Sequence, residues 1–387
     1  MKKLLFYGGT FDPPHSGHYN LLRQTLRREH FDRIVVMPTA LPPHKKAAHY
    51  LSDEKRLGAV KMLFGSLPGV TVSDYELQKG GKSYSVDTLH NLQKQYPDYE
   101  LYMLIGSDML FTFEQWHEFR EILSLCTVLT AARQKGEREQ LEAKAAQLTK
   151  AYGARVRVLN IPLRVKSSSE VRAGQKDPLL PLEVRYYLYG KEALAELFEY
   201  LKGHLTPQKY EHTLRVAEFA GDLAERYHAD ENTVYLAALL HDATKCWSKK
   251  EQLAYLKRKH YKLTAQDRRA PQIFHQFTAA LFAAERFCVR DKTILQALSC
   301  HTTGRERMTL VDKILFLSDS IELGRDYEGV EQMRAVCRTD LDRAVLMNFD
   351  RSITYIVDKG FYLHPQTVAA RNWLLRNLYL EGRNSGK

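Results

Sequence analysis

The chain has 387 residues, of which 44% are hydrophobic and 27% charged, and its formal net charge is +11 at pH 7. This length exceeds one ordinary hydrophobic core and predicts two domains, while the lack of any run of about 18 apolar residues argues against a membrane protein. The positive charge favours anionic partners such as nucleotides, but no stripe of basic and aromatic residues indicates a binding site for nucleic acid.

The five cysteines are scattered along the chain and form no Cys-x-x-Cys pair. An odd number without paired spacing predicts reduced thiols rather than a disulfide framework, and therefore a cytoplasmic protein. A strand is expected within a few residues of Met1, which leaves no space for a signal peptide.

The first distinctive segment is GGTFDPPHSGH at residues 8–18. It follows an apolar run at residues 3–7 that predicts a buried strand, and it precedes residues 19–28, whose leucines have helical spacing. A strand, a glycine-bearing turn and a helix form a common phosphate site, because glycines allow close backbone approach and the helix N-terminus presents N–H groups. His15 and His18 are one helical turn apart and can donate to the same phosphate.

The next segments alternate between strands and helices. Strands are predicted at residues 33–37 and 70–77, and a helix at residues 53–64. A loop with the sequence PPHKK follows the first of these strands at residues 42–46, a position where ligands bind in open parallel sheets. The segment SYSVDTL at residues 83–89 has the pattern of a helix start.

A fourth strand is predicted at residues 100–105 and is followed directly by Gly106, Ser107 and Asp108. A glycine at the end of a buried strand permits close approach to a ligand, and the carboxylate suits a ribose hydroxyl. Trp116 lies in the next helical stretch, where an aromatic ring ordinarily packs inward.

The last elements of this half are strands at residues 127–132 and 154–161, separated by a charged helix at residues 134–150. The segment KSSSEVR at residues 166–172 then places three hydroxyls and an arginine at a helix start. These groups can hold a triphosphate, although an ordinary serine-rich helix cap is an alternative interpretation.

Taken in order, these segments resemble the nucleotidyltransferase superfamily, whose core motif is His-x-Gly-His, and in particular the bacterial nicotinate mononucleotide adenylyltransferases. The resemblance covers residues 1–190. It implies an α/β Rossmann-like, doubly wound parallel sheet that transfers the adenylyl group of ATP to nicotinate mononucleotide, giving deamido-NAD and pyrophosphate. His15 and His18 would be catalytic by stabilising charge on the triphosphate together with Mg²⁺, not by acting as nucleophiles.

The same resemblance assigns binding roles. Trp116 would stack on the pyridine ring, and Thr88 would contact the pyridine carboxylate. The other contacts to the mononucleotide would be His44, Lys45 and Tyr84. ATP would be bound by Gly8, Gly9, Thr10, Phe11, Gly106, Asp108, Ser167, Ser168 and Arg172. The family has isoleucine and threonine where this chain has Lys166 and Ser169.

Strand patterns end near residue 190. A helix is predicted at residues 182–189, and Gly190 can end it. Beyond it, apolar residues recur with the helical period. We therefore expect a transferase domain at residues 1–193 and an all-α helical bundle at residues 194–387.

Polar side chains recur on the predicted helices of the second half, which are expected at residues 208–226, 231–240, 273–287, 292–300 and 310–317. Four histidines and two aspartates lie in or beside these helices: His212, His241, Asp242, His275, His301 and Asp319. One histidine on an apolar face is usually a packed core residue, but burying six such groups without a shared ligand would be costly. Imidazoles and carboxylates on facing helices suit a transition metal.

The order His…His-Asp…Asp, formed here by His212, His241-Asp242 and Asp319, resembles the HD phosphohydrolase superfamily. The flanking sequence resembles the bacterial HD proteins that cleave diadenosine tetraphosphate symmetrically into two ADP. The resemblance covers residues 200–380 and implies hydrolysis assisted by a divalent transition metal, with iron or manganese expected.

Further roles follow from this second resemblance. His275 and His301 would allow a second metal ion. The catalytic and substrate-binding residues would be Asp242, Lys245, Thr302 and Arg325. Around His275 the family has the sequence His-Gly-x-x-Gly-Ala, where this chain has HQFTAA at residues 275–280. The bulk of Gln276 and Thr278 is expected to alter how closely a substrate approaches.

Three alternatives stay open for the sequence alone. The helical half could be a regulatory module with a structural metal, or a broad mononucleotide phosphatase, and the chain could be associated with RNA. The expected partners are otherwise small nucleotides, namely nicotinate mononucleotide, ATP and diadenosine tetraphosphate. A homo-oligomer is compatible with the sequence.

Overall fold

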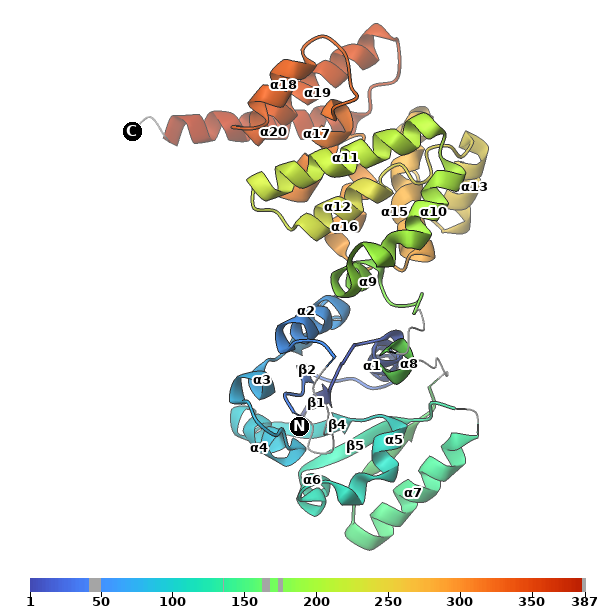
Figure 1. The fold of residues 1–387 in the computed structure, drawn as a ribbon, viewed down its shortest axis with the longest axis vertical. Helices are drawn as coiled ribbons and strands as arrows, with labels where there is room; N and C mark the ends of the chain where they lie inside the picture. The colour runs from blue at the N-terminus through green and yellow to red at the C-terminus, as the bar shows by residue number, and fades with distance from the viewer. Residues whose placement is uncertain (42–49, 135, 162–167, 173–176, 385–387) are drawn as a thin grey trace. The chain divides into compact units, whose positions relative to one another are not determined.

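The computed structural model describes the chain except residues 42–49, 135, 162–167, 173–176 and 385–387 (Figure 1). The chain divides into two compact units, Met1–Leu180 and Pro181–Lys387, and each is described on its own. This division lies one helix before the boundary expected from the sequence. Helix α9 (Leu182–Tyr189) belongs to the second unit, because Leu182 packs into the core of that unit and its N–H donates to the carbonyl of Phe287.

The first unit is built on a six-stranded parallel sheet with the order β3-β2-β1-β4-β5-β6. Its strands are β1 (Lys2–Gly9), β2 (Arg33–Pro38), β3 (Val70–Val72), β4 (Tyr99–Leu104), β5 (Cys126–Ala131) and β6 (Val156–Leu159). The central strand β1 pairs with both β2 and β4, so the winding reverses there. Such a reversal leaves a crevice at the carboxyl ends of the two strands. The predicted doubly wound α/β sheet is confirmed.

The helices of this unit include a short one that the sequence pattern did not predict. They are α1 (Ser16–Arg28), α2 (Asp53–Phe64), α3 (Tyr75–Lys79), α4 (Ser85–Gln95), α5 (Ser107–Phe111), α6 (Phe119–Leu125), α7 (Glu137–Tyr152) and α8 (Ser168–Arg172). The strand expected at residues 70–77 was wrong beyond Val72. The Ser73 hydroxyl accepts the N–H of Tyr75 and turns the chain into α3, which ends at Gly80 with a φ of 67°.

The second unit contains helices and no strand among the residues that the structure describes, which confirms the predicted all-α domain. After α9 they are α10 (Ala195–His204), α11 (Pro207–Arg226), α12 (Glu231–Leu240), α13 (Lys249–Arg258), α14 (Ala265–Arg269), α15 (Phe274–Arg286), α16 (Lys292–Cys300), α17 (Leu310–Ile321), α18 (Val330–Val336), α19 (Leu341–Asp358) and α20 (Pro365–Asn384). Helix α12 packs against α11, α16 and α17, around a shared apolar core. In the described parts of both units, no helix is long and apolar enough to cross a membrane.

Candidate active sites

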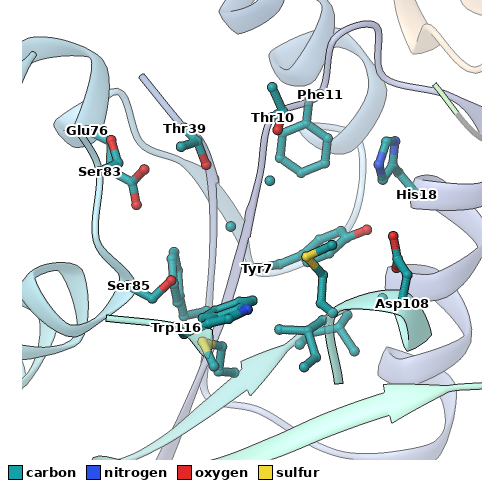
Figure 2. Close-up of a pocket in the computed structure, with 18 of the residues that line it drawn as sticks. Tyr7, Thr10, Phe11, His18, Thr39, Glu76, Ser83, Ser85, Asp108 and Trp116 are labelled. Carbon is teal, nitrogen blue, oxygen red and sulfur yellow. The ribbon is translucent and has the colours of Figure 1, made fainter. Parts of the chain in front are cut away.

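A cavity of about 420 Å³ lies at the carboxyl ends of β1 and β4 in the first unit (Figure 2). Most of the residues expected to bind nucleotide line it: Gly8, Gly9, Thr10, Phe11, His15, His18, Tyr84, Gly106, Asp108, Trp116 and Ser168. Figure 2 shows His18 and Asp108 at one end of the cavity and Trp116 and Ser85 at the other, with Tyr7 between them. The crevice of the sheet therefore brings the two halves of the predicted nucleotide site together.

Some expected contacts cannot be placed in this cavity. His44, Lys45 and Ser167 lie outside the described residues, as does the side chain of Arg172. Thr88 is described, but its side chain is buried and its hydroxyl donates to Glu76 Oε1 at 2.8 Å. It is Glu76, rather than Thr88, that lines the cavity.

His15 and His18 form a reciprocal cap at the N-terminus of α1. The backbone N–H of each residue donates to Nδ1 of the other at 3.3 Å, and the two rings stack with their centroids 3.6 Å apart. Because Nδ1 accepts a hydrogen bond in both rings, the neutral form of each ring carries its proton on Nε2. The helix start thus holds two Nε2–H donors beside its own backbone N–H groups, an arrangement suited to a phosphate.

Burial and, to a smaller extent, the positive charge of Arg133 together lower the pKa of His15 to about 3. His15 is therefore neutral at physiological pH and acts as a hydrogen-bond donor without a full charge. Arg133 also forms an ion pair with Asp108, with Nη1 and Oδ1 3.1 Å apart. Both residues line the cavity, so a cation and an anion face the nucleotide site together.

Gly106 allows this ion pair to lie against the end of β4. A Cβ atom on Gly106 would lie 2.3 Å from Arg133 Nη2 and 2.6 Å from Asp108 Oδ1. Any larger residue would therefore displace the groups expected to meet the ribose and phosphates. The sequence predicted that Gly106 permits close approach of a ligand, whereas the groups nearest to it in the structure are the side chains of Arg133 and Asp108. The role of Arg133 was not predicted.

Arg56 is a second residue that sequence reasoning missed. Its fully buried guanidinium donates from Nη1 to the carbonyls of Thr10 and Thr39 at 2.7 Å each, and Nη2 pairs with Asp53 at 2.6 Å. These carbonyls follow the ends of β1 and β2, so Arg56 fixes the turn that carries the glycines. No local sequence pattern predicts this role of Arg56, because the carbonyls that it binds are 46 and 17 residues away in the chain.

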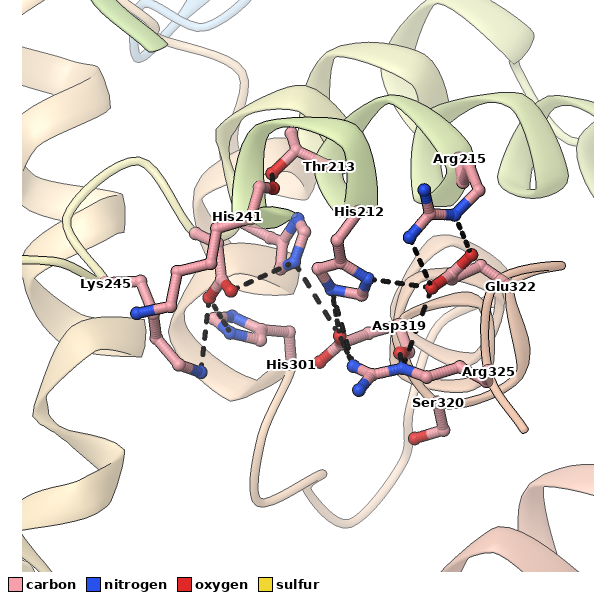
Figure 3. Close-up of polar contacts among 12 residues, drawn as sticks. His212, Thr213, Arg215, His241, Lys245, His301, Asp319, Ser320, Glu322 and Arg325 are labelled. Atoms are coloured by element: carbon pink, nitrogen blue, oxygen red, sulfur yellow. Dashed lines mark hydrogen bonds and ion pairs between the residues drawn. The ribbon is translucent and has the colours of Figure 1, made fainter. Parts of the chain in front are cut away.

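In the second unit, the six predicted metal ligands come close together, and Figure 3 shows His212, His241, His301 and Asp319 among them. They form two groups, each with its ligand atoms within 4.8 Å of one another: His212, His241 and Asp319, and Asp242, His275 and His301. The groups meet at the adjacent His241 and Asp242, where Nε2 and Oδ2 are 3.7 Å apart. The ligands come from α11, α15 and α17 and from the ends of α12 and α16.

Hydrogen bonds fix three of the imidazoles in the tautomer that a metal requires. Nδ1 of His241, His275 and His301 each lies 2.6–2.8 Å from the carbonyl oxygen three residues earlier. A carbonyl can only accept, so each Nδ1 carries the proton and each Nε2 presents its lone pair to the centre. Among the residues that the structure describes, His241 Nε2 and Asp242 Oδ1 are buried and have no hydrogen-bond partner, although Lys245 Nζ forms an ion pair with Asp242 Oδ1. These two buried acceptors and the His/Asp donor set fit a divalent transition metal.

His212 is oriented by a carboxylate instead. Its Nδ1 donates to Glu322 Oε1 at 3.1 Å, while its Nε2 lies 3.0 Å from Asp319 Oδ1. Glu322 is in turn held by Arg215 Nε at 2.6 Å and by the N–H of Gly324 (Figure 3). A carboxylate behind a ligating histidine raises the basicity of the ring, a common arrangement around protein metals.

The electrostatics of the centre favour anionic Asp242 and Asp319 and neutral rings at His275 and His301. Burial works against protonation of His212, but Asp319 and Glu322 outweigh it and raise the pKa of that ring. Burial works against ionisation of Asp242, but the charge of Lys245 and the neighbouring imidazoles outweigh it and hold its pKa below the usual range. Burial lowers the pKa of His301 to about 4 and that of His275 well below its ordinary value. These are the protonation states in which both residue types bind metals.

Cationic side chains border the centre. Lys245 Nζ lies 3.3 Å from Asp242 Oδ1 and 2.8 Å from His275 Nε2. Arg325 Nη2 lies 3.2 Å from Asp319 Oδ1, and both cations remain partly exposed. The Thr302 hydroxyl is 3.1 Å from His275 Nε2. The predicted catalytic and substrate residues therefore gather at the predicted ligands.

Gln276, where the family has glycine, does not occupy open space beside the centre. It is fully buried, and its Oε1 accepts the N–H groups of Thr302 and Thr303 at 3.2 and 3.3 Å. Thr278 is likewise buried and shares a 2.6 Å hydrogen bond with Thr244. Gln276 thus ties the loop after α16 to α15, and Thr278 ties the turn after α12 to α15.

Comparison with known proteins matches the two units to different families. Residues 6–174 match the cytidylyltransferase-like family, and residues 210–324 match the HD domain. A Mycoplasma genitalium protein, named as a probable nicotinate-nucleotide adenylyltransferase/Ap4A hydrolase, is 26% identical over 352 residues, which cover 89% of this chain and 96% of the relative.

Two relatives match one half each. The symmetrical bis(5'-nucleosyl)-tetraphosphatase of Halalkalibacterium halodurans is 38% identical over 177 residues, covering 45% of this chain and 93% of the relative. A protein of Lachnoclostridium phytofermentans, named as a probable nicotinate-nucleotide adenylyltransferase, is 30% identical over 193 residues, covering 49% of this chain and 96% of the relative.

Proposed function

We propose that the protein is a bifunctional nucleotide enzyme, because its two halves belong to two enzyme families. The N-terminal half belongs to the nicotinate-nucleotide adenylyltransferases. The C-terminal half belongs to the symmetrical bis(5'-nucleosyl)-tetraphosphatases of the HD superfamily. One site joins ATP and nicotinate mononucleotide into deamido-NAD and pyrophosphate. The other hydrolyses diadenosine tetraphosphate to two ADP. The observation that carries the proposal is the presence in one chain of a capped phosphate site and a buried His/Asp centre.

In the transferase reaction, a phosphate oxygen of nicotinate mononucleotide attacks the α-phosphorus of ATP and pyrophosphate leaves. The N-terminus of α1 and the Nε2–H groups of His15 and His18 would bind the phosphates and stabilise the charge that builds on them. Mg²⁺ carried with ATP would neutralise the remaining charge. No covalent intermediate is needed, since alignment and charge stabilisation supply the catalysis.

The ends of the cavity suit the two remaining parts of the product. Asp108 would accept hydrogen bonds from a ribose hydroxyl, as carboxylates do in other doubly wound nucleotide sites. Trp116, which stacks on Phe113 with ring centroids 4.9 Å apart, would support the pyridine ring. The first N–H groups of α4 have no side-chain cap, and they are suited to the pyridine carboxylate.

In the hydrolase site, the four histidines with Asp242 and Asp319 would hold one or two divalent ions, for which iron or manganese is proposed. Such a metal lowers the pKa of bound water and polarises a phosphate. Lys245 and Arg325 would bind the tetraphosphate and neutralise it, and the Thr302 hydroxyl would contact a phosphate oxygen. Glu322 would keep His212 in its ligating orientation.

Product analysis with the purified full-length chain tests both halves. Deamido-NAD should form from ATP and nicotinate mononucleotide, and ADP alone should form from diadenosine tetraphosphate. Release of nucleoside and phosphate from mononucleotides would indicate a phosphatase instead. Bound metal with no turnover of any nucleotide would indicate a regulatory module. A cytoplasmic location is proposed because the five cysteines are unpaired.

A further inference from the structure

One carboxyl group in the N-terminal cavity has no task in the reaction described above. Glu76 lies on α3, lines the cavity and is only 4% exposed. Its Oε1 accepts the Thr88 hydroxyl, while its Oε2 is buried and has no hydrogen-bond partner among the residues that the structure describes. An unpaired buried carboxyl oxygen is costly, and because Glu76 lines the cavity, a bound ligand can supply the missing partner.

The hydrogen bond to Glu76 also limits what Thr88 can do. A hydroxyl carries a single proton, and Thr88 gives that proton to Glu76 at 2.8 Å. Thr88 therefore cannot donate to the carboxylate of a bound pyridine at the same time. Glu76 lies at the end of the cavity where Ser85 and Trp116 are also found (Figure 2), which is the end expected to hold the pyridine ring.

The surroundings of Glu76 make it easy to protonate. Burial raises its pKa more than the hydroxyls of Thr88, Ser83 and Thr39 lower it. The nearby cation, Lys79, contributes less because its Nζ is paired with a carboxylate, Asp87 Oδ2, at 2.7 Å.

Among the described residues that line the cavity, His117 is another titratable group near this end, and its ring lies 4.4 Å from that of Tyr84. Tyr84 is the residue directly before α4. His117 therefore stands beside the expected pyridine site and must be separated from Glu76 in any test of pH dependence.

We propose that Glu76 determines the choice of pyridine by holding a proton, so that its carboxyl group donates a hydrogen bond from Oε2 to the carboxylate of nicotinate mononucleotide. The inference rests on the proposed transferase function. Two carboxylates in one buried site cannot both stay ionised at low cost. Above the pKa of Glu76, binding of the acid therefore draws one proton from solvent onto Glu76.

Nicotinamide mononucleotide provides the matched comparison. Its amide is uncharged and can donate its own N–H to an ionised Glu76, so its binding requires no proton. Both mononucleotides carry the same phosphate, which itself titrates near pH 6. The contribution of the phosphate therefore cancels in the ratio of the two KM values.

The experiment measures KM for both mononucleotides with the full-length protein between pH 6 and 9, together with binding calorimetry in two buffers of different ionisation enthalpy. The ratio of KM for the acid to KM for the amide should rise towards tenfold per pH unit above the pKa of Glu76. At the alkaline end, the acid should take up about one proton more than the amide does.

Two substitutions separate this role from a structural one. Glu76→Gln keeps the shape and supplies an N–H donor that does not titrate, so the KM ratio should become independent of pH and the extra proton uptake should vanish. Thr88→Val removes a hydroxyl that lowers the pKa of Glu76, so the rise of the ratio should move to higher pH. His117→Asn should retain the wild-type slope of the ratio.

The possible failures are distinguishable. A wild-type ratio that does not change with pH, or a Glu76→Gln variant that keeps the wild-type slope, overturns the role of Glu76 and leaves the transferase function in place. If the KM ratio of the His117→Asn variant no longer rose with pH, the pH dependence would have to be assigned to His117 instead of Glu76. Absence of dinucleotide formation from both mononucleotides would overturn the inference together with the proposed function.

Discussion

The Nε2 atoms of His275 and His301 lie 3.1 Å apart in the helical unit. Each ring gives its Nδ1 proton to a backbone carbonyl, and burial keeps the pKa of both rings below neutral pH. Two lone pairs therefore face each other, and they repel unless a cation lies near them. Lys245 Nζ is 2.8 Å from His275 Nε2 and supplies one cation. In the described part of the chain, no lysine or arginine forms a hydrogen bond with His301 Nε2.

Removal of the metal should therefore destabilise the helical unit. A metal present at 100 times its Kd contributes about 2.7 kcal/mol, which corresponds to a fall of about 5–10 °C in the Tm of a domain of this size after chelation. Calorimetry of the full chain with and without chelator, together with elemental analysis, measures the effect. Asp242→Asn serves as the control, since its Tm should respond little to chelator. An equal loss in both proteins would contradict the assignment of the centre.

The N-terminal unit should lose stability in acid because of His15. Its folded pKa is about 3, below the ordinary value of about 6.5, so the unfolded chain binds the proton more readily. Stability is therefore lost as the pH falls below about 6.5, by about 2 kcal/mol at pH 5. Hydrogen exchange of peptides from α1, corrected for intrinsic rates, should show this loss in the wild type and not in His15→Asn, which retains a capping side chain.

The control for this measurement is His30→Gln. The side chain of His30 is 89% exposed, so its substitution should leave the pH dependence of exchange in α1 unchanged. If His15→Asn still lost protection at pH 5 as the wild type does, the loss would have to come from another group.

Regular elements were predictable because their signals are local. Helices α12 and α16 have the predicted bounds, since an Asp cap and continuous apolar periodicity define each of them. The α3 segment was mistaken for strand because Val70 and Val72, and then Tyr75 and Leu77, are each two residues apart in a stretch too short to distinguish the two periods. This error concealed Glu76, which a continued strand would have placed elsewhere.

Some residues of the two candidate sites were predictable from the sequence, and others were not. The convergence of the six histidine and aspartate side chains could be predicted because several polar residues on apolar helices need a common partner. Arg56, Arg133 and Arg215 could not, because each acts on groups that only the folded chain brings near. Arg215, for example, holds Glu322 from 107 residues away, and neither residue alone differs from an ordinary exposed charge in the sequence.

Gln276 should prove necessary for the stability of the helical unit. Replacing it with the family's glycine leaves the N–H groups of Thr302 and Thr303 without their acceptor, at a cost of about 1–3 kcal/mol, in addition to about 1 kcal/mol for glycine in a helix. Gln296→Gly on the exposed face of α16 should cost only the roughly 1 kcal/mol that glycine costs in a helix. Urea unfolding of both variants measures the difference, and equal losses would show that the contacts of Gln276 contribute nothing.

The two activities should be separable by single substitutions. His18→Ala removes an Nε2–H donor from the phosphate site, and the loss of one such donor typically lowers kcat by about 100- to 1,000-fold; hydrolysis of diadenosine tetraphosphate should continue. Asp242→Ala removes a carboxylate shared by the His/Asp centre and should stop hydrolysis while dinucleotide synthesis continues. His90→Ala, at a half-exposed position on α4, should affect neither reaction.

Both reactions are assayed on the same preparations, with circular dichroism to verify folding. If either His18→Ala or Asp242→Ala stopped both reactions in a folded protein, the sites would not be independent. One of the two reactions would then need a group from the other unit.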